Sequence, residues 1–232
     1  MRTKNITNLS GMFRCCRKLV SIEFSNFDTS NVEDMSYMFY ECYELKTINL
    51  QSFNTSKVVE MNNMFTCCHR LDIINIGNFD FSKVTNFGLM FRHCKNLTSL
   101  VLPYDKGNNK ARNMNHMFSY CYILTSIDLS KIDTTNVKYM NYMFYDCNSL
   151  KTIHFNKCKT ENIEDMKYMF YNCYSITSLN LDNFYTSKVK KMSGMFYNCK
   201  KLIYLSIINF SGLSLSNCNN NMFQNVNKSI KL

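Results

Sequence analysis

The sequence is poor in the residues that interrupt regular structure: 232 residues include one proline and six glycines. Flexible linkers between domains need such residues, so we expect one uninterrupted domain. No apolar run is long enough to span a bilayer, and residues 1–5 lead into a polar stretch rather than the apolar region of a signal peptide. We therefore expect no export signal, anchor or membrane span in the chain as given.

The sequence also lacks the short motifs of the common enzyme classes. It has no G-x-S-x-G, H-E-x-x-H, P-loop or dinucleotide-binding glycine pattern, and no C-x-x-C pair. The histidines occupy four different positions of the repeat described below, and they are His69, His93, His116 and His154. We therefore expect a chain that is not an enzyme and has no cofactor or metal ion.

Apolar material, by contrast, is plentiful. Hydrophobic residues make up 46% of the sequence and charged residues 19%, which is enough to bury a core and too little charge for a disordered chain. The formal net charge is +10. These values predict a folded domain with a basic surface.

A Met-Phe pair recurs every 26 or 27 residues. Its phenylalanines are Phe13, Phe39, Phe65, Phe91, Phe118, Phe144, Phe170, Phe196 and Phe223. Three residues after each of the first eight stands a cysteine, and these are Cys16, Cys42, Cys68, Cys94, Cys121, Cys147, Cys173 and Cys199. Each unit reads M-x-x-M-F-x-x-C-x-x-L-x-x-I-x-L-x-x-F-x-T-S-x-V. Such strict recurrence places the methionine and phenylalanine stripes in a shared interior.

The apolar spacing changes within each unit. The residues that fit one face of a short helix are Met35, Met38, Phe39, Cys42 and Leu45. Ile48 and Leu50 then alternate with polar neighbours, as in a strand with one buried face. Neither element can bury its apolar side alone, so the units must stack. We expect an α/β repeat with one short strand and one short helix per 26–27-residue coil. The rival architecture, a helix bundle, is disfavoured by the strand-like segment of every unit.

The repeated string resembles a known family. One copy occupies residues 27–32 (F-D-T-S-N-V) and 35–39 (M-S-Y-M-F), and further copies begin at Phe53, Ile132 and Phe184. Over nearly the whole chain these units resemble the BspA-like leucine-rich repeat family. The resemblance implies a right-handed leucine-rich-repeat solenoid, and a surface protein that adheres to host components or to other cells.

We expect residues 1–232 to form a single leucine-rich-repeat solenoid of about nine coils. The N-terminus begins mid-repeat, because residues 3–6 align with residues 29–32. The C-terminal repeat is degenerate, with Val226 in place of the cysteine. Residues 102–112 lack the F-x-T-S-x-V string and hold the proline, so we expect a bulged or re-aimed loop there.

The eight recurring cysteines are interpreted as a structural ladder of small buried side chains. Disulfides and a zinc site are the alternatives, but zinc sites need paired ligands at short spacing, and the Cys67-Cys68-His69 run offers too few. Unpaired thiols suit a reducing compartment, whereas the resemblance implies the cell surface or secretion. A cytoplasmic location therefore stays open.

Lysines gather near the T-S-x-V segment, on one expected edge of the stack. They are Lys57, Lys83, Lys138, Lys188, Lys190 and Lys191. Some cationic stripes bind polyanions. More often they are solvated edges, and no nucleic-acid motif accompanies this one, so nucleic acid is not the expected partner.

Outward-facing strand residues are the expected binding surface. Alternation along the strands predicts one exposed ladder of Glu23, Asn49, Asn75, Val101, Asp128, His154, Asn180 and Ser206. A second ladder consists of Ser21, Thr47, Ile73, Ser99, Ser126, Thr152, Ser178 and Tyr204. Stacked Ser, Thr and Asn also stabilise a sheet without any ligand. The departures from those types, such as Tyr204, are therefore the more informative positions.

These observations predict a non-enzymatic protein-binding or adhesion module of the cell-surface type. It would bind a protein partner, by resemblance a host or cell-surface component, through the exposed strand face. The alternatives are an intracellular interaction scaffold of the same fold and a polyanion binder that uses the lysine-rich edge.

Overall fold

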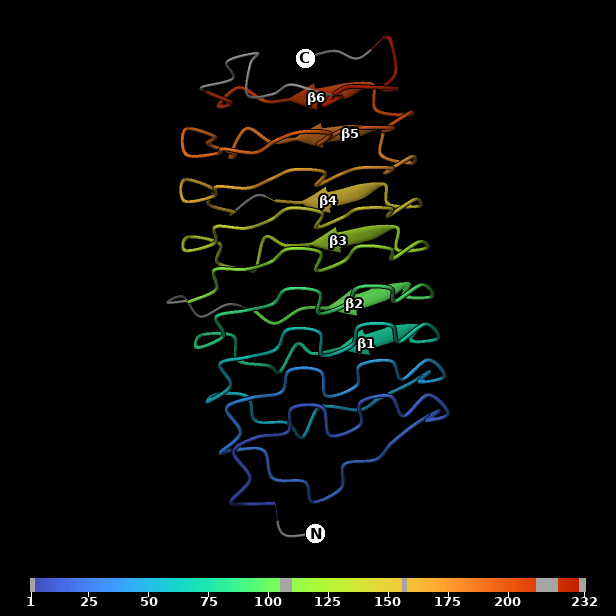
Figure 1. Cartoon of the computed structure of the whole chain (residues 1–232), viewed down its shortest axis with the longest axis vertical. Helices are drawn as coiled ribbons and strands as arrows, with labels where there is room; N and C mark the ends of the chain where they lie inside the picture. The colour runs from blue at the N-terminus through green and yellow to red at the C-terminus, as the bar shows by residue number, and fades with distance from the viewer. Residues whose placement is uncertain (1–2, 105–109, 156–157, 212–220, 230–232) are drawn as a thin grey trace.

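The computed structural model describes residues 3–104, 110–155, 158–211 and 221–229. These residues wind as a column of stacked coils, with the early coils at one end and the late coils at the other (Figure 1). Six coils each carry one three-residue strand. The strands are β1 Ile73–Asn75, β2 Ser99–Val101, β3 Ser126–Asp128, β4 Thr152–His154, β5 Ser178–Asn180 and β6 Tyr204–Ser206.

The strands pair in parallel from one coil to the next. β1 pairs with β2, β3 with β4 and β5 with β6, each in the register that aligns equivalent residues of the repeat. A second run of parallel bridges joins Asn8, Asp34, Glu60, Asn86, Asn113, Tyr139, Asp165 and Lys191 in successive coils. The expected repeat solenoid and its short stacked strands are therefore confirmed.

The expected helix is wrong for the residues that the structure describes, because none of them is helical. The M-x-x-M-F-x-x-C segment of each repeat, here called the turn ribbon, forms consecutive tight turns instead. In residues 35–42 the amides of Met38, Tyr40 and Cys42 donate to carbonyls three residues earlier, at 3.4, 3.0 and 3.1 Å. The alternate amides, those of residues 35, 37, 39 and 41, donate to carbonyls of the next coil at 2.9 to 3.0 Å. An α-helix would keep all these bonds within itself.

Two residues of each turn ribbon have a left-handed backbone. In residues 35–42 they are Tyr37, with φ 57°, and Glu41, with φ 58°. Each is the third residue of a four-residue turn, the position at which a type II turn requires positive φ. A non-glycine residue there costs about 1–2 kcal/mol. That cost is offset because the turns leave every second amide and carbonyl aimed at a neighbouring coil.

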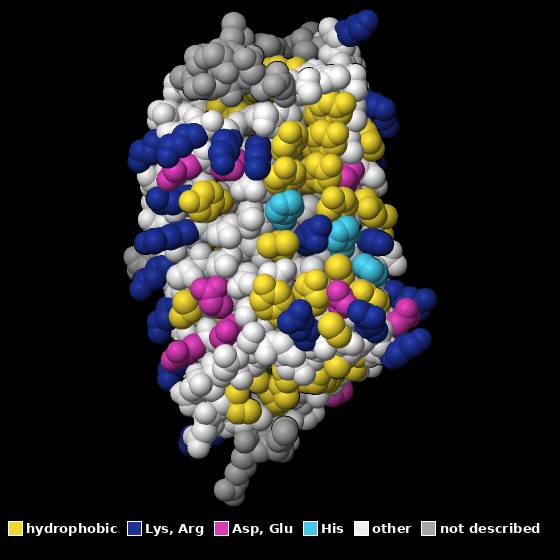
Figure 2. All heavy atoms as spheres, in the orientation of Figure 1, with side chains coloured by type: hydrophobic (Ala, Val, Ile, Leu, Met, Phe, Trp, Pro, Cys, Tyr) yellow, Lys and Arg dark blue, Asp and Glu magenta, His cyan; other side chains and the backbone are white. Residues whose placement is uncertain are grey.

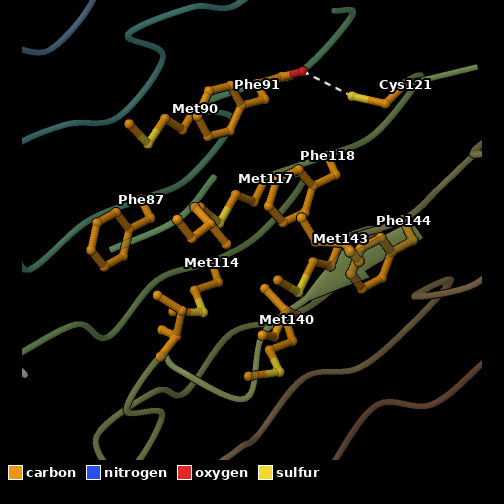
Figure 3. Close-up of a cluster of buried hydrophobic side chains, with 14 of the residues drawn as sticks. Phe87, Met90, Phe91, Met114, Met117, Phe118, Cys121, Met140, Met143 and Phe144 are labelled. Carbon is orange, nitrogen blue, oxygen red and sulfur yellow. Dashed lines mark hydrogen bonds between the residues drawn. The ribbon is translucent and has the colours of Figure 1, made fainter. Parts of the chain in front are cut away.

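The core is a set of side-chain stacks that run along the solenoid axis. Successive phenylalanine rings from Phe13 to Phe223 lie 5.4 to 5.8 Å apart and within 13° of parallel. Figure 3 shows Phe91, Phe118 and Phe144 as one such stack, with methionines packed beside it. Each aromatic pair contributes about 1 kcal/mol beyond the area that it buries.

The ladder cysteines connect the coils through their thiols. The Cys121 thiol donates to the carbonyl of Phe91 in the preceding coil at 3.2 Å (Figure 3). Equivalent bonds of 3.1 to 3.2 Å are made by Cys42, Cys68, Cys94, Cys147, Cys173 and Cys199. These seven side chains are buried, whereas Cys16 in the first coil is exposed.

The threonine of the T-S-x-V string also ties neighbouring coils together. The buried Thr29 hydroxyl donates to the carbonyl of Asn54 at 3.0 Å and accepts from the amide of the same residue at 2.7 Å. Thr55 makes the same pair of bonds to Asp80, and Thr134 to Lys159. The string therefore recurs because its hydroxyl replaces a coil-to-coil backbone bond.

The wider organisation stays a prediction. The middle of the expected bulge, residues 105–109, and part of the degenerate last repeat, residues 212–220, lie outside the described residues, as does Cys218. A single nine-coil solenoid that begins mid-repeat is still the expectation. Within the described residues no helix has the length and apolar character needed to cross a membrane.

The left-handed positions give a stability test at Leu89, where φ is 60°. We expect Leu89→Gly to have a free energy of unfolding about 1 kcal/mol higher than Leu89→Ala, because glycine adopts this backbone without a Cβ penalty. Chemical denaturation of both variants measures the difference. At Asn141, which lacks positive φ, the order should reverse. Equal stabilities at Leu89 would contradict the assigned turn geometry.

Candidate interaction surfaces

The predicted ladders lie on the surface that the strands present to solvent. On the first ladder Asn75, Val101, Asp128, His154 and Asn180 are exposed strand residues, and Ser206 is half-buried. Glu23 and Asn49 are exposed as well, in coils whose described residues form no named strand. The second ladder is exposed throughout, from Ser21 and Thr47 to Tyr204. The central residue of each strand faces the core.

Part of the first ladder is occupied by local hydrogen bonding. The side-chain oxygens of Asn49, Asn75, Asp128 and Asn180 each accept from the amide two residues later, at 2.8 to 3.0 Å. Such bonds close a turn at the end of the strand. These four residues therefore have a structural reason for their type, and they tell little about a ligand.

Large apolar side chains interrupt the polar ladders. Ile73 is 57% exposed, Val101 45% and Tyr204 55%. Ile203 and Ile208, near Tyr204 in the chain, are exposed too. Sequence reasoning included Tyr204 among the binding residues but missed Ile203 and Ile208, although an apolar residue at a solvent position was the available signal.

The lysine-rich edge carries both signs of charge, which Figure 2 shows as blue and magenta side chains on the left of the molecule. Lys138 and Lys190 donate to Glu164 at 3.1 and 2.7 Å, and these bonds lower the pKa of Glu164 to about 2. Lys191 pairs with Asp165 at 3.8 Å. Lys57 and Lys188 donate to asparagines of the preceding coil at 2.7 Å. The edge is therefore less basic than its lysine count indicates.

One open groove of about 800 Å³ lies on this edge. Its lining includes Lys110, Arg112, Lys138 and Glu60, together with several asparagines. No carboxylate of the described residues pairs with Lys110 or Arg112. This groove is the place on the lysine-rich edge best suited to an anion.

A band of aromatic side chains, missed in the sequence, follows the turn ribbons. Tyr142, Tyr145, Tyr168 and Tyr171 line an open groove of about 240 Å³, here called the tyrosine groove. Tyr145 stacks on Tyr171 at 4.7 Å, and Tyr142 lies 5.0 Å from Tyr168. In Figure 2 hydrophobic side chains, tyrosine included, form a band along the right of this face.

The histidines extend this band rather than form a catalytic cluster. His93 stacks on Tyr120 at 4.1 Å and His116 on Tyr142 at 4.4 Å, and burial lowers the pKa of each histidine to about 4. His69 stacks on Tyr43 in the same manner. His154 lies apart from them, on β4. In the part of the chain that the structure describes, no three His, Cys, Asp or Glu side chains gather in a way that could hold a metal ion.

The buried thiols are poorly reactive. Burial raises the pKa of Cys42 and Cys199 to about 12, and it raises the pKa of Cys68, Cys94 and Cys121 well above the ordinary value for a thiol. The thiolate is the nucleophile, so these side chains have a packing role. All eleven cysteines in the described residues are free thiols.

A family model described as a Mycoplasma protein of unknown function, DUF285, matches residues 1–101, 68–180 and 112–231. No curated protein matches the chain. Similar solved structures include a leucine-rich repeat protein from Eubacterium ventriosum, with 22% identity and a TM-score of 0.48; the match covers 85% of this chain and 46% of that chain. A leucine-rich repeat protein from Bacteroides ovatus has 20% identity and a TM-score of 0.42, and the match covers 86% of this chain and 63% of that chain. A leucine rich cell surface protein from Faecalibacterium prausnitzii has 18% identity and a TM-score of 0.36, and the match covers 95% of this chain and 80% of that chain. The chain spans less than two thirds of the first two. The resemblance to leucine-rich repeat proteins is confirmed.

Thiol accessibility tests the cysteine ladder. Alkylation of the native protein, mapped by peptide mass, should modify the exposed Cys15 and Cys16 first and leave the buried ladder cysteines unmodified until the protein unfolds. Rapid native labelling of Cys121 would contradict the buried ladder. Cysteines that stay unmodified after unfolding would reveal disulfides and overturn the packing role.

Acid should destabilise the fold through the stacked histidines. The pKa of His93 and His116 is about 4 in the folded chain and 6.5 ordinarily, so at these two residues only the unfolded chain takes up protons between those values. The melting temperature should therefore fall as pH drops from 6.5 towards 4. A His93→Phe/His116→Phe variant keeps the stacks without the titration, so it should show a shallower fall. Glu164 contributes only at lower pH. An unchanged slope in the variant would refute the assignment.

Proposed function

Because the chain belongs to the DUF285 family, whose description gives no function, we propose from its own surface that it is a non-enzymatic protein-binding module of the cell-surface adhesion type. It binds its partner through the exposed face of strands β1–β6. The observation that carries this proposal is the set of exposed apolar side chains on that face, Ile73, Val101 and Tyr204.

The chemistry of the face suits a protein partner. Protein interfaces combine a few aromatic or aliphatic anchors with hydrogen-bonding groups around them, and energy concentrates on the anchors. Here Tyr204 is followed and preceded in the chain by the exposed Ile208 and Ile203, while Ile73 and Val101 stand on paired strands β1 and β2. Exposed hydroxyl side chains such as Ser126 and Thr152 lie on the strands between β2 and β6.

The two alternatives use other features. An intracellular scaffold of the same fold is favoured by the free buried thiols, while the BspA-like resemblance favours the cell surface or secretion. A polyanion binder would use the groove at Lys110 and Arg112. Because Glu60 lines that groove, and Glu164 and Asp165 pair with lysines of the same edge, the strand face is the stronger proposal.

The strand face is tested by adhesion and by substitution. Beads coated with the chain should adhere to host cells or to immobilised extracellular-matrix proteins. For a purified partner so found, Tyr204→Ala should weaken binding by at least about 30-fold if Tyr204 is a central anchor. Tyr139→Ala and Tyr185→Ala remove exposed tyrosines outside the named strands and should leave affinity unchanged.

Two outcomes would overturn the strand-face proposal. One is a partner whose affinity is insensitive to Ile73→Ser, Val101→Ser and Tyr204→Ala together. The other is binding that Lys110→Glu/Arg112→Glu abolishes and that falls steeply with salt, which is the behaviour of a polyanion site.

A further inference from the structure

We propose that the open groove on the lysine-rich edge binds a single compact oxyanion, namely a phosphate or sulfate group that is either free or esterified to a small molecule. This groove, here called the basic groove, has Lys110, Arg112 and Lys138 in its lining. It lies on a different part of the coils from strands β1–β6. The inference therefore stands independently of the strand-face proposal, and it differs from a polyanion site in the size of the ligand.

Backbone hydrogen bonds place the basic residues on neighbouring coils. The Arg112 amide donates to the carbonyl of Thr85, and the Lys138 amide donates to the carbonyl of Arg112, both at 2.9 Å. Arg112 and Lys138 therefore occupy equivalent positions of adjacent coils, where like charges repel. Lys110 precedes Arg112 by two residues, and both side chains are exposed. Three cations thus stand on two coils that are about 4.8 Å apart.

Two of these three cations have no carboxylate partner in the described part of the chain. Lys138 donates to Glu164 at 3.1 Å, whereas no ion pair of the described residues includes Lys110 or Arg112. The position equivalent to Lys110 in the preceding coil holds Lys83, which is another exposed cation. Repulsion among these charges is unfavourable, and a bound anion would remove it.

Two asparagines of the lining supply donors rather than acceptors. The side-chain oxygen of Asn86 accepts from the Gly88 amide at 3.0 Å, and that of Asn113 accepts from the Asn115 amide at 2.9 Å. The backbone amides therefore determine which atom of each side chain is the oxygen. No hydrogen bond within the described residues engages the two NH2 groups. Because an NH2 group only donates, these side chains favour an anionic ligand.

The donor set favours a phosphate or sulfate group. The Arg112 guanidinium presents its donors in a planar fork that binds two oxygens of one anion, whereas the Lys110 ammonium acts as a point charge. A tetrahedral oxyanion offers oxygens in several directions and up to two negative charges, which match the two unpaired cations. A carboxylate offers two oxygens and one charge. At about 800 Å³ the basic groove is within the usual size range of small-molecule sites.

Carboxylates on both sides limit the length of the ligand. Glu60 stands two coils before Asn113, and Asp165 stands two coils after it. In Figure 2 magenta side chains lie above and below the blue ones in the middle of this edge, on the left of the molecule. The three coils between the carboxylates span roughly 10 Å from first to last. A compact oxyanion fits there, whereas a long polyanion that follows the edge would meet negative charge.

Equilibrium dialysis against radiolabelled inorganic phosphate and sulfate, at fixed ionic strength, tests the proposal. One anion should bind per chain, with a dissociation constant of about 1 mM or below. Lys110→Gln/Arg112→Gln removes both unpaired cations, so affinity should fall by about tenfold or more. Lys57→Gln/Lys188→Gln removes the same charge from lysines that donate to asparagines, and this matched control should bind as the parent does. Thermal melts of both variants verify that they fold.

A second pair of variants changes affinity in the opposite direction. Glu60→Gln removes a carboxylate from the lining, so it should tighten binding of phosphate and sulfate. Glu33→Gln, at an exposed carboxylate outside the lining, should leave the affinity unchanged. Competition by a hexose monophosphate distinguishes the source of the group. Stronger competition than by inorganic phosphate assigns the site to a monoester, and weaker competition assigns it to the free ion.

Four results would overturn the oxyanion site. No saturable binding of either ion at about 10 mM would reject it. An equal loss of affinity in Lys110→Gln/Arg112→Gln and in the control would reveal a general charge effect. Equal affinity for acetate would reject the tetrahedral ligand. Competition by a heparin oligosaccharide more than about 100-fold tighter than by sulfate would assign the edge to a polyanion. The strand-face proposal is tested separately, by partner binding at Tyr204.

Discussion

Neighbouring coils are held together because every second peptide unit of the turn ribbon points along the solenoid axis. Two left-handed residues per ribbon, such as Tyr37 and Glu41, produce this alternation. The remaining amides close turns within the coil, so the ribbon leaves few backbone groups without partners. The resulting coil spacing then brings equivalent side chains together, which is why phenylalanine rings, cysteine thiols and threonine hydroxyls all form continuous stacks.

The sequence predicts the strands well because alternation of inward and outward residues indicates a strand and no other element. In β1, for example, Ile74 lies inward between the exposed Ile73 and Asn75. It misleads in the turn ribbon, because apolar residues at i, i+3, i+4 and i+7 fit two consecutive four-residue turns as well as a helix. The left-handed positions carry only part of a signature: Asn63, Asn172 and Asn198 favour that backbone, but Tyr37 and Leu89 do not. Among the described residues of the ribbons, glycine stands at such a position only at Gly11 and Gly194. Hydrogen bonds between coils, which a single repeat does not contain, decide the outcome.

The sequence predicts only those surface features that follow from alternation within one repeat. The exposed ladders follow from local alternation, so residues such as Val101 and His154 are found from one repeat alone. The turn-closing role of Asn75 and the tyrosine groove depend on geometry beyond that alternation. Tyr145, Tyr171 and Tyr197 stand at equivalent positions of consecutive repeats, and that recurrence was the available signal.

The hydrogen bonds of the turn ribbon have one direction: amides of one coil always meet carbonyls of the next. The turn ribbon of each coil therefore presents amides to the next coil and carbonyls to the preceding one, whatever its surface residues are. Recombination between repeats that adds or removes a whole coil would leave every remaining junction chemically unchanged. The length of the array is thus free to vary in evolution, and the order of exposed side chains along it can be rewritten coil by coil without a new folding problem.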